Sequence, residues 1–174
     1  MSAKAELTKA NPMSVPFIDR VVISAGATGD ALTKSKKLLE IIAGKQAQVI
    51  ASTKRIPTFD VRPGLEVGTA ITLRGEEAIA LLKRLLGAVD NKIKKSSVAE
   101  NHLSFGIKEY IEIPGMEYQR EIGIRGLNVT VVFARPGTRV KKKKIKRGTL
   151  PSRHHVSKEE VIAKMEEQFK TEFI

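Results

Sequence analysis

Two stretches of this chain alternate between apolar residues and small or polar ones, and this pattern restricts the folds open to it. Successive side chains of a β-strand point to opposite faces of a sheet, so each stretch predicts a strand that buries one face only. In the stretch 66–74 the two faces carry Val67, Thr69, Ile71 and Leu73 against Gly68, Ala70, Thr72 and Arg74. In the stretch 124–134 they carry Leu127, Val129, Val131 and Phe133 against Asn128, Thr130 and Val132. The small and polar face is either solvated, as antiparallel sheets allow, or lies flat against a large polar partner.

Further strands and three helices are predicted around these two stretches. β-branched and alternating residues indicate strands over 15–24, 48–54 and 105–113, whereas 90–103 is expected to be irregular. Apolar residues at helical spacing indicate helices over 30–43, over 75–87 and from 157 onward. The first helix has a cap at Asp30, and its predicted buried residues are Leu32, Leu38, Leu39 and Ile42. Those of the second are Ile79, Leu82 and Leu86. The third begins with the capping box of Ser157 and Glu160, and its predicted buried residues are Val161, Met165 and Phe169.

The order of these elements is β-α-β-β-α, a long loop, then β-β-α. Short turns between successive strands imply mainly antiparallel pairing. We therefore expect an α+β fold, a two-layer sandwich with a mainly antiparallel sheet and helices packed on one face. The length suits a single domain over 1–174 with a flexible arm over 1–14.

Positive charge is concentrated in one internal segment. Residues 135–158 hold ten of the 31 lysines and arginines and none of the 19 carboxylates, in a chain of net charge +12. Such a concentration creates a local field that holds a polyanion, although charge runs are usually solvated faces. Because the run lies between a predicted strand and a predicted helix, we expect an extended segment over 135–156 that contacts nucleic acid and is unstructured without RNA.

Composition argues against several other classes of protein. The chain has no apolar run near the ~18–20 residues that span a membrane. Its first 13 residues are polar, without a signal-peptide core, which favours an intracellular protein. A basic protein at a membrane surface is less well supported, because no helix combines a cationic face with an aromatic-rich apolar one. The absence of cysteine excludes disulfides and thiolate zinc sites.

Catalytic and metal-binding patterns are scarce. Gly26 and Gly29 lie between a strand and a helix but lack the spacing of a phosphate-binding loop, so they predict a turn. His154 and His155 are adjacent and would point to opposite sides of an extended chain. No serine lies in a nucleophile-elbow context. We expect no enzyme activity, no cofactor and no metal site.

The loop 54–65 is a second candidate for RNA contact. Lys54, Arg55 and Arg62 flank Phe59, and two prolines stiffen the path. Cations can bind phosphates, and an exposed aromatic ring can stack on a base. The alternative is that Ile56 and Phe59 fold back into a small satellite core. Helix-turn-helix and zinc-finger patterns are absent, which disfavours sequence-specific DNA binding.

Nine short motifs, in this order, resemble one known family. They are Asn11-Pro-Met, Val21-Val-Ile, Arg55-Ile-Pro-Thr-Phe59, Ile71-Thr-Leu-Arg-Gly75, Leu82-Lys-Arg-Leu-Leu86, Phe105-Gly-Ile107, Ile113-Pro-Gly-Met116, Gly123-Ile-Arg-Gly126 and Ala134-Arg-Pro-Gly137. Together they resemble the archaeal large-subunit ribosomal protein five family, whose eukaryotic form is called ribosomal protein eleven. The resemblance runs from about residue 12 to the C-terminus. A basic insertion after residue 137 is typical of archaeal and eukaryotic members.

The resemblance implies a structural constituent of the large ribosomal subunit in the cytoplasm. Family members bind 5S rRNA in the central protuberance, beside 23S rRNA and neighbouring 5S-binding ribosomal proteins. They also reach the elbow of P-site tRNA and bridge to a head protein of the small subunit. By resemblance, the tRNA contacts would be Lys54, Arg55, Thr58, Phe59 and Arg62. The rRNA contacts would be Asn11, Met13, Arg20, Ser24, Thr72, Arg74 and Gly106, and we expect Lys141, Lys142, Lys143, Lys144, Lys146, Arg147 and Arg153 of the basic segment to join them.

Two positions depart from the family pattern. Ser24 stands where the family usually has Asn, which shortens a hydrogen-bonding side chain and weakens the case for that contact. Ala51 stands where the family usually has Lys, so the tRNA-facing side would depend more on Lys54 and Arg55. From charge alone, a free-standing basic regulator that binds chromatin or mRNA is an alternative, which co-sedimentation with the large subunit would separate from a ribosomal protein.

Overall fold

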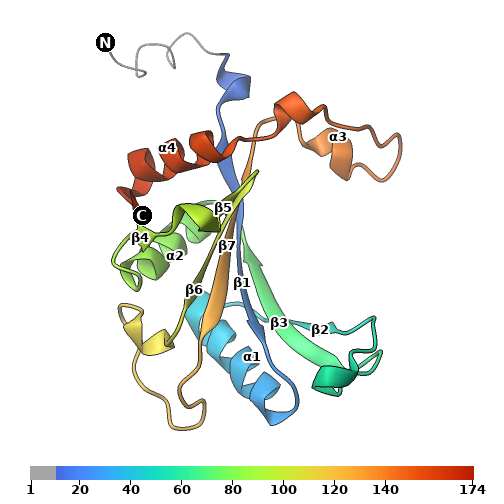
Figure 1. Ribbon diagram of the computed structural model, residues 1–174, viewed down its shortest axis with the longest axis vertical. Helices are drawn as coiled ribbons and strands as arrows, with labels where there is room; N and C mark the ends of the chain where they lie inside the picture. Colours follow the sequence, from blue (N-terminus) through green and yellow to red (C-terminus); the bar gives the residue numbers. More distant parts are fainter. Residues whose placement is uncertain (1–10) are drawn as a thin grey trace.

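A six-stranded antiparallel sheet forms the centre of the computed structural model, which describes residues 11–174 (Figure 1). Its strand order is β2-β3-β1-β7-β6-β5, and β4 and β8 pair separately in parallel. The strands are β1 (Phe17–Gly26), β2 (Gln48–Ala51), β3 (Glu66–Leu73), β4 (Lys92–Ile93), β5 (Val98–Ala99), β6 (His102–Ile107), β7 (Leu127–Ala134) and β8 (Glu172–Phe173). The helices are α1 (Asp30–Ala43), α2 (Glu76–Gly87), α3 (Arg139–Lys142) and α4 (Lys158–Phe169).

One face of the sheet forms the hydrophobic core with α1, α2 and α4. Alternate residues of β1 and β7, among them Ile23 and Val131, are fully buried. They belong to one buried cluster with Leu39 of α1, Leu82 of α2 and Met165 of α4. The prediction of a two-layer α+β sandwich with helices on one face is therefore confirmed.

The helices begin and end close to where the sequence predicts them, with two differences. Gly29 rather than Asp30 precedes the first turn of α1, and no side chain caps it. The prediction of a cap at Asp30 was therefore wrong: this carboxylate lies inside the first turn, where it still suits the helix dipole. In α2, Ile79 is only partly buried, because Leu81 and Leu85 share the inward face with Leu82 and Leu86. The capping box of α4 is present as predicted, with its apolar stripe buried.

Two predicted stretches have different local structure. The strand predicted over 105–113 starts earlier and ends at Ile107, after which Tyr110–Glu112 forms a 3-10 turn. Tyr110 is fully buried, and its hydroxyl oxygen accepts a hydrogen bond of 2.8 Å from the backbone N–H of Gln119. Burying this ring turns the chain out of the strand. The stretch 90–103, expected to be irregular, contains β4 and β5 and the first residues of β6.

The predicted N-terminal arm and the predicted extended segment both contain some regular structure. Residues 1–10 of the arm lie outside the described residues, and Pro12–Ser14 forms a 3-10 turn just before β1. The basic segment (135–156) is not extended throughout, because it contains α3 and a 3-10 turn at Ser152–His154. Figure 1 shows it projecting from one end of the sheet, whereas the β2–β3 loop (52–65) projects from the other end.

Candidate nucleic-acid interface

The sheet face opposite the helices, which we call the open face, is built from small side chains. The register places Ser24 of β1 between Ala70 of β3 and Asn128 of β7, and Asn128 beside Gly106 of β6. In the next row, Val22 lies between Thr72 and Thr130, with Ser104 beyond Thr130. All of these residues are exposed or half-buried, whereas their neighbours along each strand are buried in the core. A broad polar surface therefore stays open to solvent over the middle of the sheet.

Two features keep the open face free of protruding side chains. The hydroxyls of Ser104 and Thr130 lie 3.1 Å apart, which ties adjacent strands together. A Cβ atom at Gly106 would lie 3.3 Å from the Oδ1 atom of Asn128, so glycine leaves room for the amide beside it. A planar base edge or a sugar could approach this surface without meeting a long side chain.

Arginines border the open face at the end nearer the basic segment. Val21 and Leu73 pair with each other and are buried, so alternation places Arg20 and Arg74, the next residues toward this end, on the open face. The Nε atom of Arg20 lies 3.8 Å from a carboxylate oxygen of Asp19, whereas Arg74 is exposed. A guanidinium group at the border of a flat polar surface can bind phosphate oxygens of a polyanion that lies on it.

The basic segment is closed at its base by two pairs of contacts. Arg135 donates two hydrogen bonds to the carboxylate of Glu160, at 2.6 and 2.7 Å, and a longer one of 3.4 Å to the carbonyl of Arg153. Asn101 accepts a hydrogen bond from the backbone N–H of Val156 at 2.8 Å, and its own backbone N–H donates to the Val156 carbonyl at 3.1 Å. The segment therefore leaves and re-enters the fold at a fixed place.

Within the basic segment, the structure separates paired cations from unpaired ones. Lys142 lies 3.1 Å from a carboxylate oxygen of Asp19, a residue at the irregular step in the pairing of β1 with β7. Over residues 11–174, the other predicted cations of this segment have no carboxylate within 4.0 Å, and all are exposed: Lys141, Lys143, Lys144, Lys146, Arg147 and Arg153. The sequence did not reveal Asp19 and Glu160 as partners of this segment, because nothing in their spacing connects them to it. Asp19 lies 123 residues from Lys142 along the chain.

The β2–β3 loop is compact and its aromatic residue points outward. Ile56 and Val61 exchange backbone hydrogen bonds of 2.9 and 3.1 Å, and Pro57–Phe59 forms a 3-10 turn between them. Phe59 is 76% exposed and Ile56 is 41% exposed, so the alternative of a small satellite core is wrong. Only Val61 of the loop tip is buried.

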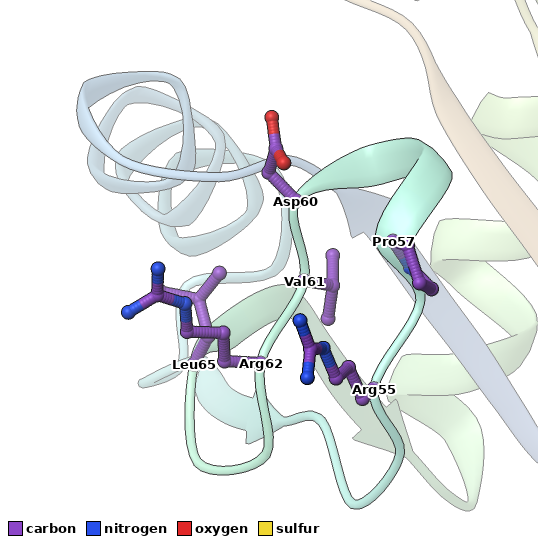
Figure 2. Close-up of a pocket in the computed structure, with 6 residues that line it drawn as sticks. All are labelled: Arg55, Pro57, Asp60, Val61, Arg62 and Leu65. Atoms are coloured by element: carbon purple, nitrogen blue, oxygen red, sulfur yellow. The ribbon is translucent and has the colours of Figure 1, made fainter.

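A pocket of about 420 Å³ lies on this loop (Figure 2). We call it the loop pocket, and it is lined by Arg55, Pro57, Asp60, Val61, Arg62 and Leu65. Figure 2 shows the Arg55 side chain directed toward Val61, while the Asp60 carboxylate points away from both arginines. Lys54, Thr58 and Phe59, the other predicted tRNA contacts, are exposed on the same loop.

The predicted site residues therefore fall into distinct places. Arg20, Ser24, Thr72, Arg74 and Gly106 share the open face. Asn11 and Met13 are exposed ahead of β1, where the Asn11 side chain accepts a hydrogen bond of 3.0 Å from the Met13 backbone N–H. The β2–β3 loop and the basic segment lie at opposite ends of the sheet, so they cannot form one site.

Residues 11–174 contain no cluster of three or more side chains suited to a metal ion. His155 faces Glu100 at 4.0 Å, and His154 lies beside Gly137. None of the helices described in this part of the chain is long and apolar enough to cross a membrane.

Comparison with known proteins gives consistent matches along most of the chain. The model for the C-terminus of the ribosomal L5 family matches residues 66–163, from β3 into α4. Large ribosomal subunit protein uL5 of Nanoarchaeum equitans is 41% identical over 167 residues, which cover 94% of this chain and 99% of the relative. The proteins of the same name from Aeropyrum pernix and Sulfolobus acidocaldarius are each 38% identical, over 95% and 94% of this chain and 88% and 94% of their own lengths. The residues that the family model matches include β3, β6 and β7 of the open face and the basic segment.

Proposed function

Because the chain belongs to the L5 family of large-subunit ribosomal proteins, we propose that it binds 5S rRNA in the central protuberance through its open face. Membership of this family makes it a structural constituent of the cytoplasmic large ribosomal subunit, and not an enzyme. What remains to be assigned is the role of each surface.

The open face carries the proposal for 5S rRNA. It combines a low floor of small residues, such as Ser24 and Gly106, with Arg20 and Arg74 at one end. Folded RNA is recognised mostly by shape, with contacts to sugar hydroxyls and phosphates, and such a floor suits that mode. Asn11 and Met13, ahead of β1, would extend this contact beyond the sheet.

The basic segment would neutralise phosphates of 5S or 23S rRNA. Its exposed cations include Lys143, Lys144 and Arg147, and its base is fixed by Arg135 and Glu160. Fixing the base directs the charge toward one region of the RNA surface. The flexible lysine side chains at the tip can then adapt to the phosphates they meet.

The β2–β3 loop would contact the elbow of P-site tRNA. Its exposed Phe59 offers a stacking surface, and Lys54, Arg55 and Arg62 offer cations around it. This loop lies at the end of the sheet away from the basic segment, so both RNA contacts could be made at once.

The segment 108–126 is suited to protein partners rather than RNA. It contains four glutamates against three cations and exposes Ile111, Tyr118 and Ile124. Its ends are held by a hydrogen bond of 3.1 Å from the Tyr110 backbone N–H to the Arg125 carbonyl. Exposed apolar side chains without excess positive charge fit a protein interface, so we assign the bridge to a small-subunit head protein to this segment. Neighbouring 5S-binding proteins are further candidates for it.

Gly106 offers a direct test of the 5S contact. Gly106→Val would raise a branched side chain from the floor of the open face without removing any charge. We expect affinity for a 5S rRNA transcript at physiological ionic strength to fall by about tenfold, as a steric effect of order 1–3 kcal/mol. The melting temperature and the titration of the native chain serve as controls. A native chain that stays folded but does not bind the transcript would overturn the proposal, and full binding by a folded Gly106→Val variant would remove the open face from it.

A further inference from the structure

We propose that Asn101 is a positioning residue for RNA binding, because it holds both ends of the basic segment and so fixes where the exposed cations can reach. This role rests on the rRNA contact proposed above for the basic segment. It belongs to a residue that lies outside the segment and carries no charge. The hydrogen bonds of Asn101, its backbone conformation and the burial of its partners support the inference.

Asn101 forms hydrogen bonds with the chain on both sides of the basic segment. Its backbone carbonyl accepts from the N–H of Phe133 at 2.7 Å, shortly before the segment begins. Its side-chain Oδ1 atom accepts from the N–H of Val156 at 2.8 Å, and its own N–H donates to the Val156 carbonyl at 3.1 Å. One residue therefore joins the strand that leads into the segment to the last residue of the segment. The chain between them is closed into a loop.

The backbone conformation of Asn101 explains why this residue type suits the position. Asn101 lies in the turn between β5 and β6, next to the pair formed by Ala99 and His102. Its φ of +62° is in the left-handed region, which glycine, asparagine and aspartate adopt more readily than other residues. Glycine would satisfy the turn but would leave the Val156 N–H without its acceptor. Asparagine satisfies the turn and supplies the acceptor.

The partners of Asn101 are buried. Phe133 is 2% exposed and Val156 is fully buried, and both belong to the hydrophobic core. A backbone N–H that loses its acceptor in such surroundings keeps the cost of leaving water. The chain near Val156 would therefore have to open to hydrate this group, and opening there would free one end of the basic segment.

A closed base should raise the affinity for RNA by reducing the disorder that binding must remove. The exposed cations, among them Lys143, Lys144 and Arg147, lie on a chain whose two ends are already fixed. Fixing the ends of a flexible chain costs entropy, and here that cost is met during folding rather than on contact with phosphates. Removing the Asn101 side chain should therefore weaken binding without changing the number of phosphates that are met.

The test measures the affinity of the full chain for a 5S rRNA transcript over a range of salt concentrations. Asn101→Gly keeps the turn and both backbone hydrogen bonds, and it removes only the acceptor for the Val156 N–H. We expect about a tenfold loss of affinity, as for an unpaired buried donor. The slope of log affinity against log salt should not change, because no cation is lost. Faster exchange of the Val156 amide hydrogen and faster trypsin cleavage within 135–156 should accompany the loss.

Two single variants serve as controls. Asn101→Asp restores an acceptor oxygen and tolerates the same φ, so protection of the Val156 amide should return. Its affinity should fall by no more than about threefold, from the added negative charge. Asn91→Gly replaces an asparagine with a similar φ of +57°, in the connection between α2 and β4. We expect this variant to leave affinity and cleavage unchanged.

A double-mutant cycle separates positioning of the cations from a general effect on the fold. Asn101→Gly is combined with the replacement of Lys141, Lys143 and Lys144 by Ala, and the affinities of all four chains for the same transcript are compared. Because Asn101 is proposed to act through these cations, Asn101→Gly should cost much less in the Ala background than in the native one.

Several results would overturn the inference. Native affinity in a folded Asn101→Gly variant would show that closure of the base does not matter for binding. A tenfold loss that persists in the Ala background would mean that the variant distorts the turn or β6 instead of releasing the cations. A loss that Asn101→Asp fails to restore would exclude the hydrogen bond to Val156 as the cause. Failure of the native chain to bind 5S rRNA would remove the proposed function itself, which is a different outcome from failure of the positioning role alone.

Discussion

The basic segment and the β2–β3 loop are both cationic, but they present their charge in opposite ways. The basic segment exposes many lysines and arginines, and fixed contacts occur mainly at its base, between Arg135 and Glu160. The loop has few cations, and several backbone hydrogen bonds hold it, among them those between Ile56 and Val61, with one aromatic ring at its tip. The basic segment is distinguished by its charge density, and the β2–β3 loop is distinguished by the fixed shape of its backbone.

We propose that this difference leads to two kinds of RNA contact. Phosphate neutralisation releases counterions, so its contribution to affinity falls steeply as salt increases. Stacking of a base on an aromatic ring displaces no counterions and should be much less sensitive to salt. The two regions can therefore be distinguished by the salt dependence of the affinity that each substitution removes.

The largest effect is expected from the unpaired lysines of the basic segment. Replacing Lys141, Lys143 and Lys144 with Ala should weaken 5S rRNA binding on the order of 100-fold at low salt and reduce the slope of log affinity against log salt by about three. The melting temperature should not change, because these side chains are exposed. Titrations at several salt concentrations measure the slope.

The matched control for this variant is the triple substitution of Lys34, Lys36 and Lys83 with Ala. It removes the same charge from α1 and α2, on the helical side of the sheet. An equal loss in both variants would mean that net charge, and not the basic segment, carries the affinity. A collapse of the melting temperature in the first variant would place the lysines in the core.

Phe59→Ala tests the opposite kind of contact. We expect about a tenfold loss of tRNA affinity, in line with base–aromatic stacking, with the salt slope unchanged and 5S rRNA binding retained. Native gels with tRNA and with 5S rRNA make the comparison. Loss of 5S binding in this variant would contradict the division of roles between the two regions.

Glu160→Gln tests whether the base of the basic segment is held by its ion pair. Glutamine can keep the capping box with Ser157 but not the charged pair with Arg135. The expected cost is about 1 kcal/mol of unfolding free energy, since the glutamate is partly exposed, together with faster trypsin cleavage within 135–156. Glu167→Gln on the same helix, whose carboxylate lies 3.6 Å from Lys164 of that helix, should leave both measurements unchanged. Equal cleavage of the two variants would show that the pair does not hold the segment.

Asp19→Asn should have the smallest effect and the opposite sign. It releases Lys142 from its ion pair and removes a negative charge at the base of the basic segment. We expect 5S rRNA affinity to rise about two- to threefold and the salt slope to steepen by up to about one. Weaker binding in this variant would show instead that the pair positions α3 for its contact.

The sequence predicted those features that depend on local pattern. Alternation located β3 and β7, helical spacing located α1 and α4, and the capping box of Ser157 was correct. The missed features depend on contacts distant in sequence. Tyr110 ends its strand because its ring is buried and its hydroxyl meets Gln119. Lys142 is paired because folding brings it to Asp19, which the charge run alone could not reveal.

The same distinction between local sequence pattern and distant contacts applies to the candidate site. The open face was predictable, because the small residues of β1, β3, β6 and β7 recur at every second position. The exposure of Phe59 was the favoured interpretation and is confirmed, but the sequence left a satellite core open as the alternative, because an apolar ring in a loop is compatible with both. The loop pocket depends on the hydrogen-bonded path of the backbone between Ser52 and Leu65, which composition does not determine.

The most direct measurement is the affinity of the native chain for 5S rRNA as a function of salt, with the melting temperature followed in parallel. If six to ten phosphates are met, affinity should fall by roughly 10³–10⁵ between low and moderate salt. The fold should stay intact over that range, and the basic segment should account for a large part of the slope. A nearly flat dependence in a folded protein would contradict the claim that concentrated positive charge, beside a flat polar sheet face, holds this protein on RNA.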